Sequence, residues 1–255
     1  FQTKRYTLNI EATKRLKSLV QSQRVALNSF LNGLWALILG KHFNKKAISY
    51  GITVSGRPPQ FQGIEGMSNQ FMNTLPVCLP LPPNQSFSSW IQEQQRQLNH
   101  IRKYEYVSLD QIGNWQEHAS GSSLFDSLFL FAHSVWQDVK SGNLVIHEMD
   151  SNVTSTYPVT VAIKEGERLA ITFQYDAQAI SSPLADWLLR QLQTLLTLPS
   201  FEGNIEHIQS HLEEAIPNKI KAPTLLHEPF PISKYEAPSQ NVLELQLITI
   251  WENLF

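Results

Sequence analysis

The stretch YGITVSGRPPQFQGIEGMSNQFMNTLPVCLPL, residues 50–81, contains two strand patterns separated by a loop rich in glycine and proline. Apolar residues alternate with small or polar ones from Ile48 to Val54, which is the period of a β-strand. The strand pattern resumes from Leu75 to Leu81. Pro76 and Pro80 each lack the N–H that a sheet ladder needs, so we expect the second strand at the edge of a sheet.

Helical patterns flank these strands. The segment FLNGLWALIL, residues 30–39, lies in a predicted helix from Asn28 to Phe43 whose apolar residues surround most of its circumference, which indicates burial on several sides. A helix at about 87–103 carries apolar residues on one side and glutamines on the other. Another is expected to begin at SSP, with Ser182 as the cap and Pro183 as the first helical residue.

A β-hairpin is predicted between Pro158–Ile163 and Leu169–Tyr175, with Gly166 in the turn. Helices and strands alternate along the chain without strict βαβ repeats. The sequence therefore predicts an α/β fold, in the form of a sandwich with a mixed sheet.

The bulk composition excludes several classes of function. The 255 residues are 42% hydrophobic and 16% charged, with a formal net charge of −2, so a nucleic acid or an anionic membrane has no electrostatic support as a partner. The longest apolar run is too short to cross a bilayer. Cys78 is the only cysteine, which suits a reducing compartment, and we expect a cytoplasmic location.

Three isolated features are candidates for chemical sites. His207 and His211 stand four residues apart and have the spacing of metal ligands, but no third ligand is near in the sequence, so a solvated helix face is favoured and no metal is predicted. Cys78 lies among apolar neighbours without an activating base, which favours a buried thiol. His133 follows an aromatic strand pattern, where a packed strand-end histidine is favoured over a functional one.

The character of the sequence changes after about residue 199. Residues 215–240 hold five prolines with little periodicity, as expected for a semi-extended linker. The following NVLELQLITIWENLF places apolar residues on one helical face, which one helix cannot bury alone. Together these patterns predict a compact part, a linker, and the start of another domain.

Five motifs in order resemble the C-terminal half of condensation domains of nonribosomal peptide synthetases. They are the quoted stretch 50–81, YEYVSLDQIGNW (104–115), SSLFDSLFLF (122–131), TYPVTVAI (156–163) and RLAITFQYD (168–176). One departure is Ser68-Asn69-Gln70, where the family usually has a Val-Gly-Leu-like run. The resemblance implies one lobe of a chloramphenicol acetyltransferase-like fold over residues 1–212.

The end of the chain carries a second resemblance. YEAPSQNVLELQLITIWENLF, residues 235–255, looks like the linker and first helix of a carrier-protein domain. It implies a linker at 213–238 and a truncated carrier domain at 239–255. The serine that would carry a phosphopantetheine arm is not in this chain, so we expect no covalently bound cofactor here, only the phosphopantetheine arms of partner carrier domains.

The family resemblance also implies a mechanism. A complete condensation domain forms an amide between an acyl or peptidyl thioester and an aminoacyl thioester, both held on carrier domains upstream and downstream. Its catalytic motif, H-H-x-x-x-D-G, belongs to the N-terminal lobe, and none of the eight histidines here is next to another. The chain is therefore expected to lack catalytic residues, to need the N-terminal lobe as a partner, and to be inactive alone.

The resemblance implies that Ser55, Gly56, Arg57, Asn73 and Thr74 line the tunnel for the phosphopantetheine arms. These residue types are equally suited to turns and strand-end hydrogen bonds, so a structural role stays open. For Arg57, bracing the loop through Glu65 is favoured over binding a phosphate. Two alternatives to amide formation also stay open: a non-catalytic module that docks carrier domains, and an ester-forming, cyclising or epimerising member of the family.

Overall fold

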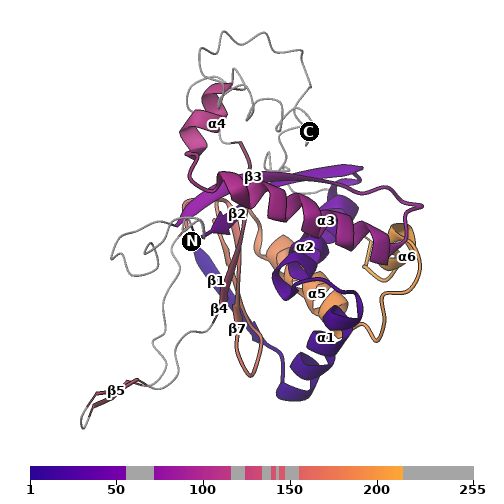
Figure 1. Cartoon of the computed structure of the whole chain (residues 1–255), viewed down its shortest axis with the longest axis horizontal. Helices are drawn as coiled ribbons and strands as arrows, with labels where there is room; N and C mark the ends of the chain where they lie inside the picture. The colour runs from indigo at the N-terminus through magenta and orange to yellow at the C-terminus, as the bar shows by residue number, and fades with distance from the viewer. Residues whose placement is uncertain (56–71, 116–123, 134–138, 142–143, 147–154, 215–255) are drawn as a thin grey trace.

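The fold has a layer of helices packed on one side of a six-stranded sheet (Figure 1). The computed structural model describes residues 1–55, 72–115, 124–133, 139–141, 144–146 and 155–214. The sheet has the order β1-β8-β7-β4-β2-β3, in which β4 is parallel to both β2 and β7 and the other pairs are antiparallel. The mixed α/β sandwich predicted from the sequence is confirmed.

The bounds of the elements follow the predicted periods closely. The strands of the main sheet are β1 (Gln2–Thr7), β2 (Ala47–Val54), β3 (Asn73–Pro80), β4 (Ser127–His133), β7 (Val159–Glu165) and β8 (Ala170–Tyr175). A separate hairpin consists of β5 (Val139–Ser141) and β6 (Leu144–Ile146). The helices are α1 (Ile10–Ser22), α2 (Leu27–Phe43), α3 (Phe87–Ile101), the 3-10 helix η2 (Arg102–Tyr104), α4 (Leu109–Trp115), α5 (Ser182–Thr197) and α6 (Ile205–Ser210).

Helix α2 forms the centre of the core. Every residue of α2 from 29 to 40 is buried, as its all-round apolar pattern predicted. Gly33 allows α3 to approach closely, because a Cβ at this position would overlap with Ile91 and lie 3.2 Å from the ring of Trp90. On the sheet side, the indole N–H of Trp35 donates to the hydroxyl of Ser127 over 3.0 Å, so the helix is tied to β4 by a buried hydrogen bond.

Strand β3 lies at the edge of the sheet, as its prolines predicted. The backbone N–H of Leu81 donates to the carbonyl of Lys46 over 2.7 Å, next to the end of the β2–β3 ladder. Because hydrogen-bonded residues alternate in an antiparallel pair, the N–H positions of even-numbered β3 residues face away from β2. Pro76 and Pro80 therefore stand where no ladder donor is needed.

The sheet is buried on both faces in its centre. Tyr50 points toward the helices, where its hydroxyl donates to the backbone carbonyl of Asn32. On the opposite face, Gly51 lies against the ring of Phe125, which stacks on Tyr157 with ring centroids 5.0 Å apart. The space above Gly51 is thus filled by an aromatic side chain that its alternating strand pattern alone does not indicate.

Helix α3 differs from the expected pattern at one glutamine. Its apolar face is buried as predicted, but Gln94 belongs to that face and is only 1% exposed. The reason is the helical period: Gln94 stands four residues from both Trp90 and Leu98, so the three side chains share one stripe. The prediction that the glutamines occupy the other side was wrong for this residue.

The start of α5 is shifted by one residue from the prediction. Ser181, and not Ser182, is the N-cap, and its hydroxyl accepts a hydrogen bond from the N–H of Leu184. Ser182 is the first helical residue, and its hydroxyl accepts from the ammonium of Lys4 instead. Pro183 remains in the first turn, where its missing N–H leaves no helical bond unmade.

One histidine in the core contact between α2 and α5 makes stability depend on pH. The ring of His42 lies between Phe43 and Trp187, with centroids 4.5 and 5.0 Å away. Burial lowers the pKa of His42 because the charged imidazolium is poorly solvated there. The unfolded chain then binds more protons than the folded chain as the pH falls below about 6.5, so folding stability is lost in that range.

We therefore expect the free energy of unfolding, measured by urea denaturation, to fall less between pH 7.5 and 5.5 in His42→Phe than in the natural chain. His207→Gln is the matched control, because His207 is exposed on α6. An unchanged pH dependence in His42→Phe would show that this ring is not the titrating group.

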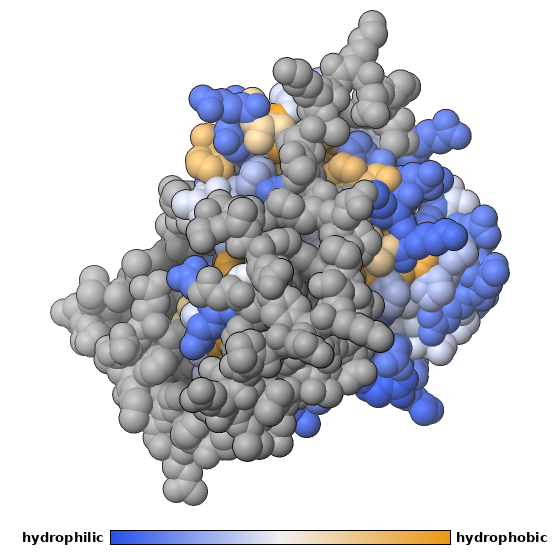
Figure 2. All heavy atoms as spheres, turned by 90° about the horizontal axis from the view of Figure 1, so that it is seen from above, coloured by the Kyte–Doolittle hydropathy of each residue, from blue (hydrophilic) through white to orange (hydrophobic). Residues whose placement is uncertain are grey.

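One face of the molecule can be compared with the hydropathy of its residues. In the face shown in Figure 2, hydrophilic residues cover most of the described area and hydrophobic residues show only in smaller areas between them. Among the described helices, none combines the length and the apolar content that a bilayer crossing requires.

Candidate functional site

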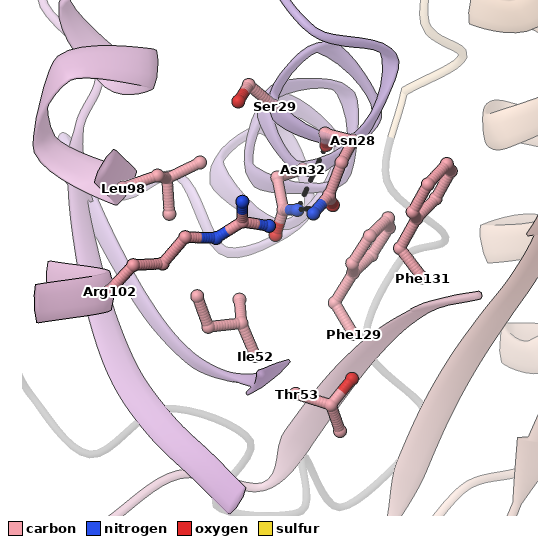
Figure 3. Close-up of a pocket in the computed structure, with 9 residues that line it drawn as sticks. All are labelled: Asn28, Ser29, Asn32, Ile52, Thr53, Leu98, Arg102, Phe129 and Phe131. Carbon is pink, nitrogen blue, oxygen red and sulfur yellow. Dashed lines mark hydrogen bonds between the residues drawn. The ribbon is translucent and has the colours of Figure 1, made fainter. Parts of the chain in front are cut away.

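A pocket opens where α2 begins and where α3 ends, above the carboxyl ends of β2 and β4. It is small, with an interior volume of about 10 Å³, which is room for about one water molecule. The side chains come from five elements, α2, β2, α3, η2 and β4, and they surround one space in Figure 3. The lining residues are Asn28, Ser29, Asn32, Ile52, Thr53, Leu98, Arg102, Phe129 and Phe131.

Two asparagines one helical turn apart form the polar floor of the pocket. The side-chain amide of Asn32 donates to the backbone carbonyl of Asn28 over 3.0 Å and to its side-chain oxygen over 2.7 Å. The hydroxyl of Tyr50 lies 2.9 Å from the carbonyl of Asn32 and 3.3 Å from its side-chain oxygen. Asn32 is 2% exposed, so this network holds both amides in one orientation.

The tyrosine below this floor stays neutral. Burial raises the pKa of Tyr50 well above its usual value, because a phenolate in the core would lose its hydration. None of the nine lining residues carries an imidazole or a carboxylate. Among these residues the pocket therefore offers hydrogen bonds and one guanidinium group, and no general base for neutral pH.

Arg102 supplies the positive charge. Its side chain extends from the end of α3 between Leu98 and Ile52, and its guanidinium group points toward the two asparagines (Figure 3). Within the described part of the chain, no carboxylate pairs with this guanidinium. The pocket thus combines apolar walls and an amide floor with an arginine that is exposed to solvent.

Next to the pocket, the structure brings together three of the five predicted tunnel residues. Ser55 follows β2, and Asn73 and Thr74 begin β3, where Asn73 pairs with Val54 and Thr74 with Thr53. This strand-end cluster (Ser55, Asn73 and Thr74) lies next to the pocket, because Thr53, which lines the pocket, pairs with Thr74, but none of the three cluster residues lines the pocket itself. Gly56 and Arg57, with the proposed partner Glu65, lie outside the described residues.

The amide of Asn73 is engaged with the backbone. Its nitrogen donates to the carbonyls of Glu105 and Val107 over 2.9 and 2.6 Å, and its oxygen accepts from the N–H of Thr74 over 2.8 Å. The hydroxyl of Ser55 donates to the Glu105 carboxylate over 3.4 Å. These contacts hold the segment after η2 against the end of the sheet, which supports the structural role left open for Asn73.

Sequence reasoning missed the pocket residues. One signal was present: Asn28 and Asn32 stand four residues apart in a helix that is otherwise apolar, and such polar pairs in a buried stretch point to a buried network or a site. No local pattern marks Arg102, Phe129 or Phe131, because only the packing of α3 and β4 brings them to the start of α2.

The other candidates for chemical sites do not form a centre in the described part of the chain. His207 and His211 lie on or next to the short helix α6, with ring centroids 5.0 Å apart. Among the described residues, no group of three or more His, Cys, Asp or Glu gathers where it would hold a metal ion. Burial raises the pKa of the Cys78 thiol, which is the opposite of what an activated nucleophile requires. His133 is the last residue of β4.

Comparisons with known proteins agree with this architecture. The family model described as "Condensation domain" matches residues 1–221. One of the proteins that make up the linear gramicidin synthase of Brevibacillus parabrevis is 33% identical over 189 residues, which are 73% of this chain and 2% of that protein. The chain thus spans a small fraction of the length of this relative.

Solved structures support the same fold. The first condensation domain of the calcium-dependent antibiotic synthetase superimposes with a TM-score of 0.66 at 14% identity, over 80% of this chain and 47% of that domain's chain. The epimerization domain from the third module of tyrocidine synthetase B gives a TM-score of 0.60 at 15% identity, over 82% of this chain and 48% of that one. The predicted resemblance to one lobe of the chloramphenicol acetyltransferase-like fold is confirmed. With a family model that matches more than four fifths of its length, the chain belongs to the condensation-domain family of nonribosomal peptide synthetases.

Proposed function

We propose that this chain is the C-terminal lobe of a condensation domain that forms an amide bond between two carrier-bound thioesters. The observation that carries the proposal is that 80% of the chain superimposes on 47% of a solved condensation domain, so that one further lobe of similar size completes the fold. The proposed lobe covers residues 1–212, followed by a linker at 213–238 and the first helix of a carrier domain at 239–255.

The proposed reaction is the aminolysis of a thioester. The amine of the aminoacyl thioester attacks the carbonyl carbon of the acyl or peptidyl thioester; a C–N bond forms, the C–S bond breaks, and the ammonium proton leaves while the thiolate takes up a proton. Holding the two thioesters in reacting geometry contributes much of the rate enhancement. In this proposal the N-terminal lobe supplies the base. The C-terminal lobe, which this chain forms, positions the substrates.

The strand-end cluster and the pocket are the proposed positioning surface. Ser55, Asn73 and Thr74, with Gly56 and Arg57, which follow Ser55 in the sequence, are proposed to line the tunnel through which the phosphopantetheine arms of upstream and downstream carrier domains enter. The position of this cluster next to the pocket supports the proposal, because Thr53 lines the pocket and pairs with Thr74. We place the reaction in the cytoplasm, where the single free cysteine is compatible with a reducing environment.

A non-catalytic docking module is the second candidate. It is favoured by one observation: none of the residues that line the described pocket can act as a base near neutral pH. The fold also matches an epimerization domain, so an epimerising, cyclising or ester-forming reaction is a further member of the same class. The mass and the stereochemistry of the product distinguish these reactions.

The function is tested by comparing residues 1–255 with the intact two-lobed domain. With an acyl-carrier donor and an aminoacyl-carrier acceptor, we expect the intact domain to form the amide, and residues 1–255 alone to give no more product than the protein-free reaction. Mass spectrometry of the carrier-bound product is the measurement. Turnover by residues 1–255 alone would overturn the assignment of catalysis to the other lobe, and an inactive intact domain that still binds both carriers would favour the docking module.

A further inference from the structure

We propose that the carboxylate of Glu105 binds the α-ammonium group of the aminoacyl acceptor and holds it at the end of the sheet before the amine reacts. The inference rests on the proposed function and goes beyond it, because it assigns a residue of this lobe to the nucleophile. Three properties of Glu105 support it: the burial of its side chain, the fixed position of its segment, and the chemistry of the groups proposed to pass it.

The burial of Glu105 is unusual for a charged residue. Glu105 is only 5% exposed, and a glutamate is almost never buried this far without a partner that offsets its charge. None of the ion pairs between described residues includes Glu105, and the two cations that precede it, Arg102 and Lys103, are exposed. A cation bound here would offset the cost of removing this carboxylate from water.

One oxygen of the carboxylate remains open to a ligand. Oε2 accepts a hydrogen bond from the hydroxyl of Ser55 over 3.4 Å, whereas no described residue donates to Oε1. Oε1 does not belong to the side-chain atoms that are both fully buried and without a partner, so it keeps a small contact with solvent. This contact is the side from which a cationic group can approach Glu105.

The segment that carries Glu105 is fixed on both sides of this residue. The side-chain amide of Asn73 donates to the carbonyls of Glu105 and Val107, which ties the segment to the start of β3. Directly after it, the N–H of Ser108 donates to the side-chain oxygen of Gln111, and the N–H of Gln111 donates to the hydroxyl of Ser108, each over 3.2 Å. The carboxylate is therefore held in place before a ligand arrives, which lowers the entropic cost of binding.

The groups proposed to enter the tunnel include one cation that every acceptor carries. The pantetheine chain and the thioester are neutral and the phosphate of the arm is negative, whereas the α-amine of an aminoacyl group is mostly protonated at neutral pH. Glu105 contacts Ser55 and Asn73, which belong to the proposed tunnel wall. An ammonium held there forms a charge-assisted hydrogen bond with the carboxylate, and the base of the N-terminal lobe then takes its proton before the C–N bond forms.

A hydroxyl group is close in size to an ammonium group but carries no charge, so the two can be compared as ligands. We expect the glycyl-pantetheine analogue in which an amide replaces the thioester to bind the intact two-lobed domain about tenfold more tightly than the matching glycolyl analogue, measured by isothermal titration calorimetry, because a hydrogen bond between charged groups is stronger than a neutral one. Glu105→Gln, which keeps an acceptor for Ser55, should abolish this preference. Glu93→Gln should keep it, because Glu93 pairs with Arg96 on α3.

A cationic side chain of the N-terminal lobe is the other possible partner for Glu105, and the same probes distinguish it from the substrate. Equal binding of both analogues to the natural domain would show that the carboxylate is already neutralised, and it overturns the proposal whether or not Glu105→Gln folds. A preference for the glycyl analogue that persists in a folded Glu105→Gln variant, with folding checked by urea denaturation, also overturns it. Tighter binding of the glycolyl analogue contradicts the proposal and favours an ester-forming enzyme.

Turnover of the intact domain then separates this inference from the proposed function. We expect Glu105→Gln to raise the KM for the aminoacyl acceptor about tenfold and to leave the KM for the acyl donor unchanged, a difference that a purely structural role of Glu105 does not produce. Equal changes in both KM values would contradict the assignment. Absence of any amide with every acceptor in the natural enzyme contradicts the proposed function, while the binding experiment still decides the role of Glu105.

Discussion

Gly51→Ala is expected to lower the free energy of unfolding by about 2–3 kcal/mol, the usual range for overpacking a core. Gly51 is buried in β2, with its hydrogen atoms toward the ring of Phe125. A Cβ there would overlap with two ring atoms, and a third would lie only 2.9 Å away. The ring has little room to move, because Phe125 is 1% exposed and stacks on Tyr157.

Urea denaturation measures the effect, and two further variants identify its cause. Gly113→Ala is the matched control, because no atom lies within 4 Å of the Cβ it adds to α4; alanine there should be neutral or stabilising by up to about 1 kcal/mol. Phe125→Leu leaves space beside residue 51, so Gly51→Ala should cost less in that background than in the natural chain. Additive effects of the two substitutions would rule out the clash as the cause.

Asn73→Asp is expected to destabilise the fold by about 3 kcal/mol, through the loss of two hydrogen bonds and the desolvation of two carbonyls. The carboxylate keeps an acceptor for the N–H of Thr74 but has no donor for the carbonyls of Glu105 and Val107. The segment that follows Arg102 is then no longer held against the sheet, so turnover of the intact domain should fall together with stability.

Thr74→Val is the control for this prediction. Thr74 is the neighbour of Asn73, and no described residue forms a hydrogen bond with its hydroxyl, so valine there should change the free energy of unfolding by no more than about 0.5 kcal/mol. Urea denaturation and amide formation are measured on the same variants. If Asn73→Asp abolishes turnover without lowering stability, its amide acts on the substrate in the tunnel rather than on the backbone.

Periodicity predicted the elements well because burial follows the period of the backbone. The all-round apolar pattern of Asn28–Phe43 marked the central helix, and it is buried from Ser29 to Gly40. The prolines of β3 marked an edge strand for a local reason: a residue without an N–H is tolerated only where the ladder needs no donor. Predictions of this kind depend only on residues that are close together in the sequence, so the sequence alone is enough to make them.

The boundaries and the exceptions depended on contacts that are distant in the sequence. By residue type, either of the two adjacent serines at the start of α5 could be the N-cap. In the structure, Ser181 is the N-cap, and the hydroxyl of Ser182 accepts a hydrogen bond from Lys4 instead. Gln94 shares the buried stripe of α3 although a glutamine usually faces solvent. Of the predicted tunnel residues, Ser55, Asn73 and Thr74 lie together next to the pocket, and their role in the tunnel stays a prediction.

The amino-acid sequence alone determined the family, the sandwich fold and the edge position of β3, because these depend on residue type and period along the chain. Only the tertiary structure decided the pocket, because Asn28, Arg102 and Phe129 meet through the packing of α2, α3 and β4, and no local pattern encodes a meeting of residues so far apart. The tertiary structure also determines which side chain packs against Gly51. A glycine allows a close approach, but only the rest of the fold places the ring of Phe125 there.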